Sequence, residues 1–266
     1  MTNPLVDADW LFEHRNDARL IILDARSPKS KVIEKIPNSI HFDLEETFSD
    51  VASGLPHTMI SPEKFQHEAR KLGIDQNSTI VVYDDIGSYW SPRVWWMFRS
   101  MGFENIEVLN GGLIAWKDAG FETVENFISP TETGNFTSKY KSEFFCSASE
   151  LFEKISEKSS VVIDARNTDR YNGLVDEPRQ GLKRGHIPTA INIPFEDCLA
   201  GNRLKPKPDL EKLFDDLNKQ TQLIFSCGSG VTACIVALAA TVAGFDDLRV
   251  YDGSWSEWGS GDFPVA

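Results

Sequence analysis

The sequence predicts an α/β protein built from two tandem copies of one domain, each a mostly parallel sheet with helices on both faces. Segments of the first half return in the second half in the same order and at nearly constant spacing, which indicates a duplicated domain. Within each half, short apolar runs typical of strands alternate with helical patterns, and this alternation is typical of parallel sheets covered by helices. A chain of 266 residues is long enough for two such domains.

Matched segments define the boundaries of the two copies. We expect a first domain over residues 1–120 and a second over residues 144–266. The intervening residues 121–143 are polar, contain Pro130 and Gly134, and are predicted to form the linker. The matched pairs are residues 22–26 with 162–166, 36–40 with 187–191, 80–84 with 223–227, 101–103 with 243–245, and 108–116 with 250–258.

The elements of each copy follow from local patterns. Ser61 and Pro62 favour a helix start, because serine caps the first turn and proline fits into it. The second copy opens with Ser147 and Glu150, spaced as a capping box, and repeats the order of the first. The elements predicted for the first copy are a helix near 7–15, strands near 20–24 and 39–42, a helix near 62–72, a strand near 79–83, a helix near 91–101, a strand near 105–109 and a helix near 112–118.

The composition excludes several classes of protein. Hydrophobic residues make up 41% and charged residues 25% of the chain, as in ordinary globular proteins. A net charge of −13 opposes binding to nucleic acid or to anionic membrane surfaces. No apolar run approaches the roughly 20 residues that span a bilayer, and the acidic start lacks the pattern of a secretion or mitochondrial signal. We therefore expect a cytoplasmic protein with neither nucleic acid nor membrane as partner.

The four cysteines do not form a disulfide framework, and no two of them are spaced as C-x-x-C. The sequence also contains no dinucleotide fingerprint. We therefore expect no metal and no organic cofactor. The cysteines are Cys146, Cys198, Cys227 and Cys234.

Cys227 stands at a junction suited to nucleophilic chemistry. An apolar strand pattern at 223–225 leads into it, and an apolar helical pattern follows at 231–243. The intervening Gly-Ser-Gly lets backbone N–H groups turn toward one point, where the helix N-terminus adds partial positive charge. Such a position stabilises the thiolate, the form of cysteine that attacks. The alternative is a strand-to-helix turn with a buried, inert cysteine.

The residues around Cys227 are predicted to bind the anion that forms there. The N–H groups of residues 228–233 would cradle a negatively charged sulfur. The Ser229 hydroxyl would hydrogen-bond the cysteine sulfur or relay a proton, unless serine is simply a small residue suited to the turn. The residues expected to line the anion are Gly228, Gly230, Val231 and Thr232, and we expect the Thr232 side chain to cap the helix.

Together the repeat and the cysteine loop resemble the tandem rhodanese-like sulfurtransferases over nearly the whole chain. In that family the second copy carries the catalytic cysteine, and here Asp84 stands opposite Cys227 in the repeat. The resemblance implies that the first domain is catalytically silent. The neutral loop after Cys227 and the segment 164–179 resemble the 3-mercaptopyruvate group, whereas thiosulfate enzymes typically carry basic residues after the cysteine. Further marks are the segments 185–188 and 251–255.

The resemblance also implies roles for residues outside the loop. Arg170 and Arg179 correspond to the arginines that hold the keto-acid substrate, and two guanidinium forks suit a carboxylate beside a ketone. The alternative is a pair of surface salt bridges with Asp176 and Glu177. His57 matches a position near the substrate. Glu45 is the best match to the acidic residue of the family's catalytic triad.

Some residues present in both copies are assigned a structural role. Asp24 and Asp164 end corresponding strands, and Arg26 and Arg166 follow them two residues later. Because one copy is silent, we expect these residues to serve as local hydrogen-bonding partners. We expect His186 to hold the turn before residue 187.

The function expected from the resemblance is transfer of sulfur from 3-mercaptopyruvate through a persulfide on Cys227, releasing pyruvate. The acceptor would be thioredoxin, another small thiol, or cyanide in an assay. The near alternative is thiosulfate as donor. A cysteine phosphatase needs His-Cys-x5-Arg, and here Ser226 and Ala233 occupy the histidine and arginine positions. A sulfur-carrier or interaction module with little turnover is the non-enzymatic alternative.

Overall fold

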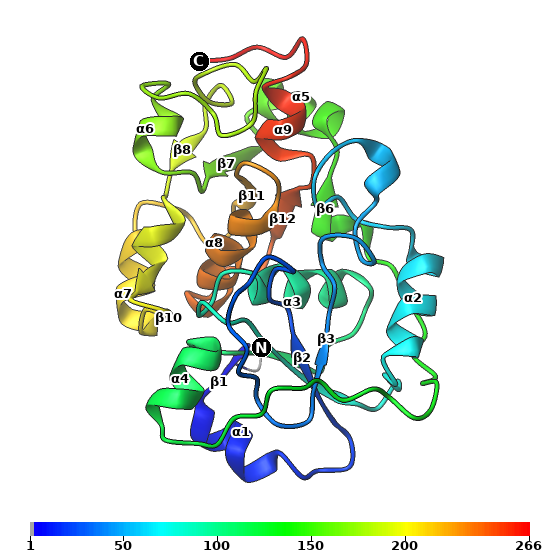
Figure 1. The fold of residues 1–266 in the computed structure, drawn as a ribbon. Helices are drawn as coiled ribbons and strands as arrows, with labels where there is room; N and C mark the ends of the chain where they lie inside the picture. The colour runs from blue at the N-terminus through cyan, green and yellow to red at the C-terminus, as the bar shows by residue number, and fades with distance from the viewer. Residues whose placement is uncertain (1–2) are drawn as a thin grey trace. The chain divides into compact units, whose positions relative to one another are not determined.

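The computed structural model describes residues 3–266 and divides into two compact units, each with its own five-stranded sheet (Figure 1). Each unit draws one short segment from the other half of the sequence. The first unit comprises Met1–Ser49, Met59–Lys141 and Gly201–Leu204, and the second comprises Asp50–Thr58, Ser142–Ala200 and Lys205–Ala266.

The sheet of the first unit is parallel throughout, in the order β1-β5-β4-β2-β3. Its central strand β4 is a run of apolar and β-branched residues, which suits a strand buried on both faces. The strands are β1 (Leu5–Val6), β2 (Leu20–Asp24), β3 (Ser39–His41), β4 (Thr79–Tyr83) and β5 (Ile106–Leu109).

Helices cover both faces of this sheet. Leu11 of α1 and Trp116 of α4 join one buried cluster with Ile22 and Val81 of the sheet. On the other side, the helices α2 and α3 meet through edge-to-face aromatic contacts such as that of their two phenylalanines, whose centroids are 5.0 Å apart. The helices are α1 (Ala8–His14), α2 (Pro62–Lys71), α3 (Ser91–Ser100) and α4 (Gly112–Asp118).

The second unit repeats this topology with the strand order β6-β12-β11-β7-β8. Its strands are β6 (Phe145–Cys146), β7 (Ser160–Asp164), β8 (Ile191–Asn192), β11 (Gln222–Ser226) and β12 (Leu248–Tyr251), and a short strand β9 (Leu199–Ala200) also lies in it. The strand β10 (Arg203–Leu204) falls in the first unit. The helices are α5 (Ala148–Glu157), α6 (Thr168–Tyr171), α7 (Lys207–Leu213), α8 (Val231–Val242) and α9 (Ser254–Trp258), with 3₁₀ turns at Val51–Ser53, Ser142–Phe144 and Phe195–Cys198.

The predicted fold class is confirmed, and so are the predicted capping signals. Ser61 accepts a hydrogen bond from the backbone of α2, with proline in the first turn. Ser147 and Glu150 form both halves of the capping box of α5. The sequence patterns did not reveal the short edge strands β1 and β6 or the single turn of α6. Among residues 3–266, no helix combines the length and apolar character needed to cross a membrane.

The topology places the loops of interest at one edge of each sheet. In the first unit Asp84 follows the last residue of β4, and in the second unit Cys227 follows the last residue of β11. Both strands are central in parallel sheets, and such sheets bind ligands at the carboxyl ends of their strands. We therefore expect the functional site at the edge of the sheet that carries Cys227.

Candidate active site

Cys227 lies between a buried strand and a buried helix. Its residue is 2% exposed, and α8 begins only four residues further on. The turn is made by Gly230, which precedes the helix with a φ of 77°, a conformation that favours glycine. The cysteine is thus held close to the N-terminus of a twelve-residue helix, where partial positive charge gathers.

The first turn of α9 fixes the backbone of the cysteine loop. Trp255 N donates to Cys227 O at 2.9 Å, and both the N–H and the hydroxyl of Ser256 donate to Gly228 O at 3.0 and 2.6 Å. Cys227 N donates to Ser254 Oγ at 3.2 Å. In a trans peptide the carbonyl and the next N–H point in opposite directions, so the N–H groups of Gly228 and Ser229 point away from α9.

The expectation that Thr232 caps α8 is wrong. Gly230 occupies the N-cap position, and within residues 3–266 no side chain makes a capping hydrogen bond to this helix. The glycine-rich turn enters the helix directly and leaves Thr232 one position inside its first turn. The first N–H groups of a helix have no partner within it, so those of α8 can bind an anion.

Two arginines lie beside the cysteine loop. A methyl group placed on the Gly228 Cα would stand 3.0 Å from Nη2 of Arg170 and 3.7 Å from Nη1 of Arg179. Arg170 belongs to α6, and Arg179 lies in the loop that follows. Both guanidinium groups therefore reach the residue next to Cys227, and glycine leaves the space for them. Their role as substrate ligands stays a prediction.

Ser229 faces a histidine from a distant part of the sequence. Its Oγ lies 3.2 Å from Nδ1 of His57, and the serine is largely buried. His57 belongs to the Asp50–Thr58 segment of the second unit and has a φ of 61°, which is unusual outside glycine. The second unit thus brings together Cys227, Ser229 and His57, as well as the two arginines.

Glu45 belongs to the first unit. Its Oε1 accepts a hydrogen bond from Ser27 Oγ at 2.6 Å. Its place in a catalytic triad remains a prediction that rests on the family correspondence.

The other cysteines are poor nucleophiles or are engaged elsewhere. Burial raises the pKa of Cys146 to about 12 and that of Cys198 to about 12. The Cys234 thiol is fully buried in α8 and donates to Gly230 O at 3.2 Å. The thiolate is the attacking form, so Cys227 is the remaining candidate.

The corresponding loop of the first unit is closed around its own carboxylate. Asp84 is fully buried, and its Oδ2 accepts hydrogen bonds from the backbone N–H groups of Tyr89, Trp90 and Ser91, each at 2.9 Å. The Ser91 hydroxyl also donates to this oxygen at 2.8 Å, and Ile86 N donates to Oδ1 at 3.2 Å. The loop is therefore an anion cradle whose ligand is part of the chain.

The residues predicted to be structural in both halves have that role. Asp24 accepts from the side chain and N–H of Arg26, and Asp164 accepts likewise from Arg166. His186 Nδ1 lies 2.9 Å from Tyr171 O, and the two rings are stacked. The prediction that the two aspartate–arginine pairs are local hydrogen-bonding partners is confirmed, whereas the His186 side chain contacts Tyr171 rather than the turn before residue 187.

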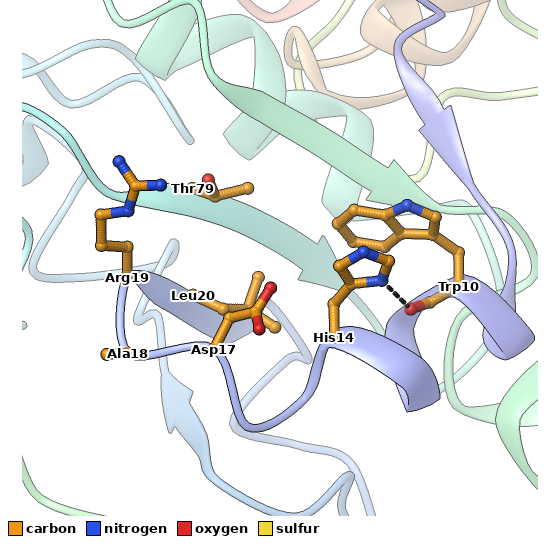
Figure 2. A pocket seen from close by; sticks show the side chains of 7 residues that line it. All are labelled: Trp10, His14, Asp17, Ala18, Arg19, Leu20 and Thr79. Atoms are coloured by element: carbon orange, nitrogen blue, oxygen red, sulfur yellow. Dashed lines mark hydrogen bonds between the residues drawn. The ribbon is translucent and has the colours of Figure 1, made fainter.

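A cavity of about 420 Å³ lies at the opposite edge of the first unit's sheet (Figure 2). Its lining includes the first residues of β2 and β4, Leu20 and Thr79, whereas Asp84 follows the other end of β4. The rings of Trp10 and His14 are stacked there, 4.1 Å between centroids. The cavity holds no thiol and lies away from the edge where parallel sheets bind ligands, so it is not the candidate active site.

Sequence reasoning missed Glu177 and the serines of α9 as parts of the site. Glu177 was considered only as a surface salt-bridge partner, yet its side chain is 2% exposed and contacts both Arg166 and Arg170. Two adjacent acids, Asp176 and Glu177, between Arg170 and Arg179 were the available signal. Ser254 lies within the segment 251–255 used as a family mark, and Ser256 follows that segment directly.

Comparison with known proteins agrees with this geometry. The rhodanese-like domain family matches residues 7–119 and again residues 147–260. The chain therefore belongs to the rhodanese-like family, as two domains in tandem.

Within the family, the relatives include enzymes named 3-mercaptopyruvate sulfurtransferase. The one from Escherichia coli K12 is 38% identical over 99% of this chain and 98% of its own length. The human one is 36% identical over 96% of this chain and 91% of its own length. The crystal structure of SseA from Escherichia coli, a 3-mercaptopyruvate enzyme, matches with a TM-score of 0.85 at 34% identity, covering 96% of this chain and 99% of that one.

Proposed function

We propose that this protein is a 3-mercaptopyruvate sulfurtransferase. The observation that carries the proposal is the position of Arg170 and Arg179, whose guanidinium groups flank Gly228 next to a buried Cys227. The two guanidinium groups lie beside Gly228, the residue that follows the cysteine. A nucleophilic sulfur with two carboxylate-binding arginines next to it suits a small anionic sulfur donor. The relatives with this activity in their names support the choice.

In the first step the Cys227 thiolate attacks the thiol sulfur of mercaptopyruvate. A sulfur–sulfur bond forms, and the carbon–sulfur bond breaks with its electron pair going to carbon. The leaving group is the enolate of pyruvate, which takes up a proton. Arg170 and Arg179 would hold the carboxylate and the enolate oxygen, and they would stabilise the charge that develops during transfer.

In the second step an acceptor thiolate attacks the outer sulfur of the Cys227 persulfide and releases the Cys227 thiolate. We propose thioredoxin or another small thiol as the acceptor, and cyanide serves in its place in an assay. The N–H groups at the start of α8 would cradle the outer sulfur between the two steps. We propose the cytoplasm as the location of the protein.

Ser229 and His57 would form a path for proton transfer, either from the thiol of the donor or to the enolate of pyruvate. The 3.2 Å separation of Ser229 Oγ and His57 Nδ1 is within hydrogen-bond reach, and such a pair suits general acid–base work. We propose Glu45 as the acidic member of the catalytic triad, on the family correspondence alone.

Thiosulfate is the second candidate donor. Two relatives from Arabidopsis thaliana, both 34% identical, are named thiosulfate/3-mercaptopyruvate sulfurtransferases. The covalent chemistry on Cys227 would be the same. The neutral Gly-Ser-Gly after the cysteine favours mercaptopyruvate, and we propose a preference of at least about tenfold in kcat/KM, which equals about 1.4 kcal/mol.

The test compares both donors on one preparation. Pyruvate release reports mercaptopyruvate turnover, and thiocyanate release in cyanide reports thiosulfate turnover. Intact-mass analysis after treatment with donor alone should show one added sulfur on the wild type and on Cys234→Ser, and none on Cys227→Ser. Sulfur on another cysteine, or a wild type that prefers thiosulfate, would contradict the proposal. Persulfide formation without turnover would favour the sulfur-carrier alternative.

A further inference from the structure

Glu177 is a buried carboxylate in an otherwise exposed loop. Its side chain is 2% exposed, whereas that of the preceding Asp176 is 84% exposed. Leu174 and Val175, earlier in the same loop, are also exposed. Burying a charged group costs free energy unless it is paired, so a specific arrangement must hold Glu177 inside.

That arrangement is a double contact with two arginines. Oε1 of Glu177 accepts hydrogen bonds from Nη1 of Arg166 at 2.8 Å and from Nε of Arg170 at 3.1 Å. Its Oε2 accepts from Nη2 of Arg170 at 2.5 Å. The two carboxylate oxygens of Glu177 thus accept hydrogen bonds from Nε and Nη2 of Arg170. The remaining N–H groups of the guanidinium can still donate to a ligand.

Arg166 anchors this contact in the core of the second unit. Its side chain is fully buried, it pairs with Asp164 at 2.6 Å, and its guanidinium carbon lies 4.2 Å from the centre of the Trp255 ring. Charges therefore alternate from Asp164 through Arg166 and Glu177 to Arg170. The last member of this row is the one that stands beside Gly228.

The silent half has the start of this row but not its end. Arg26 pairs with Asp24, as Arg166 pairs with Asp164. The rest of its fork donates to backbone carbonyls, Val32 O at 2.6 Å and Glu34 O at 2.8 Å, instead of to a carboxylate. The aspartate–arginine pair is common to both halves, but the Glu177–Arg170 extension accompanies the cysteine.

We propose that Glu177 is a positioning residue, which holds the Arg170 guanidinium beside Gly228 so that it can bind the carboxylate of the sulfur donor. The proposal rests on the proposed function for the identity of the donor. A rigid fork already oriented toward the carboxylate loses less conformational freedom on binding than a mobile arginine does. Loss of Glu177 should therefore weaken binding of carboxylates even though it removes a negative charge from an anion site.

Alkylation of Cys227 tests this without any sulfur transfer. Iodoacetate and iodoacetamide attack the same thiolate, but only iodoacetate carries a carboxylate. The ratio of their second-order rate constants at Cys227, followed by peptide mass, isolates recognition of that group. We would measure it for the wild type, Glu177→Gln, Arg170→Ala, the double variant, and Asp176→Asn as the matched control from the exposed part of the loop.

We expect the ratio of the iodoacetate rate constant to the iodoacetamide rate constant to fall about tenfold in Glu177→Gln and in Arg170→Ala. In the double variant we expect it to fall no further. The iodoacetamide rate reports any change in the reactivity of the thiolate itself, which the ratio cancels, and Asp176→Asn should match the wild type in both rates. A ratio that rises or stays constant in Glu177→Gln would overturn the proposal, because removing the charge alone predicts a rise. Additive losses in the double variant would also overturn it, because independent residues add.

Two further measurements keep the outcomes separate. If Glu177→Gln does not fold, Glu177→Asp serves for the same test. Its side chain keeps the negative charge but is one methylene shorter, so the carboxylate lies further from Arg170. An unchanged rate ratio in Glu177→Asp would refute the positioning role of Glu177. In wild-type assays, absence of pyruvate release would refute the proposed function, whereas the alkylation ratio would still decide the role of Glu177. In an active enzyme, Glu177→Gln should raise KM for mercaptopyruvate more than it lowers kcat.

Discussion

Replacing Asp84 with asparagine should remove a pH dependence from the stability of the first unit. Burial raises the pKa of the Asp84 carboxyl from its usual 3.8 to about 6, and the hydrogen bonds from Ser91, Trp90 and Tyr89 offset part of that rise. Because the folded pKa is the higher one, the folded state binds the proton more tightly than the unfolded state. This contribution to stability is fully present below pH 3.8 and is lost as the pH rises through about 6.

The size of the effect follows from the two pKa values. A shift from 3.8 to about 6 corresponds to about 3 kcal/mol over the whole range, and about 2 kcal/mol of this falls between pH 4 and pH 7. The amide of Asp84→Asn does not titrate, and its oxygen can still accept from the loop N–H groups. The unfolding free energy of the wild type minus that of the variant should therefore decrease by about 2 kcal/mol from pH 4 to pH 7.

Urea unfolding at a series of pH values measures this difference, with Asp118→Asn, an exposed position in the same unit, as the control for loss of one charge. Other carboxylates titrate alike in both proteins and cancel in the difference. A difference that stays constant over this range, or grows as the pH rises, would refute the reasoning. Sulfur transfer at pH 7 should stay within tenfold of the wild type, because we expect the first unit to be catalytically silent.

Other changes test the second unit. Gly228→Ala would place a methyl group 3.0 Å from Nη2 of Arg170; we expect KM for mercaptopyruvate to rise severalfold in steady-state kinetics, and an unchanged KM would contradict this contact. Arg179→Ala should lower kcat/KM for mercaptopyruvate about ten- to a hundredfold, as for a lost charge-assisted hydrogen bond, and affect thiosulfate less; equal losses with both donors would argue against a carboxylate clamp. His57→Ala should slow single-turnover pyruvate release by about a hundredfold if the histidine moves a proton, and a loss below threefold would exclude that role. Ser147→Ala should lower the free energy of unfolding of the second unit by about 1 kcal/mol in urea unfolding. An unchanged free energy would show that the capping box of α5 does not contribute to stability.

Local patterns were sufficient for most of the fold. The apolar run before Cys227 and the apolar helix after it are β11 and α8, and the signals at Ser61 and Ser147 mark real helix starts. These features depend on neighbours in sequence, so one copy of the pattern is enough to predict them. The repeat then indicated that the same order of elements recurs in the second half, whereas the order of strands in each sheet came from the structure.

The contacts that complete the candidate site depend on distant residues and were only partly predictable. His57 reaches Ser229 from 172 residues away, on a segment that belongs to the second unit although it lies in the first half of the sequence. Surface salt bridges with Asp176 and Glu177 were only the alternative to a carboxylate clamp, and two adjacent acids do not reveal that one of them, Glu177, is buried. Thr232 was assigned as a cap because the side-chain preference is strong, but Gly230 makes the turn itself.

The filled cradle of the first unit bears on how freely the two halves can diverge. Four backbone N–H groups and one hydroxyl there converge on Asp84, whose carboxylate is made by the chain and never leaves. A cysteine at this position would supply a thiol, but beyond its pair with Asp24 the Arg26 fork of this unit donates to the backbone carbonyls of Val32 and Glu34 and not to a second carboxylate. If sulfur transfer proceeds on Cys227 as proposed, a second centre in the first unit would need further substitutions beyond the one at Asp84.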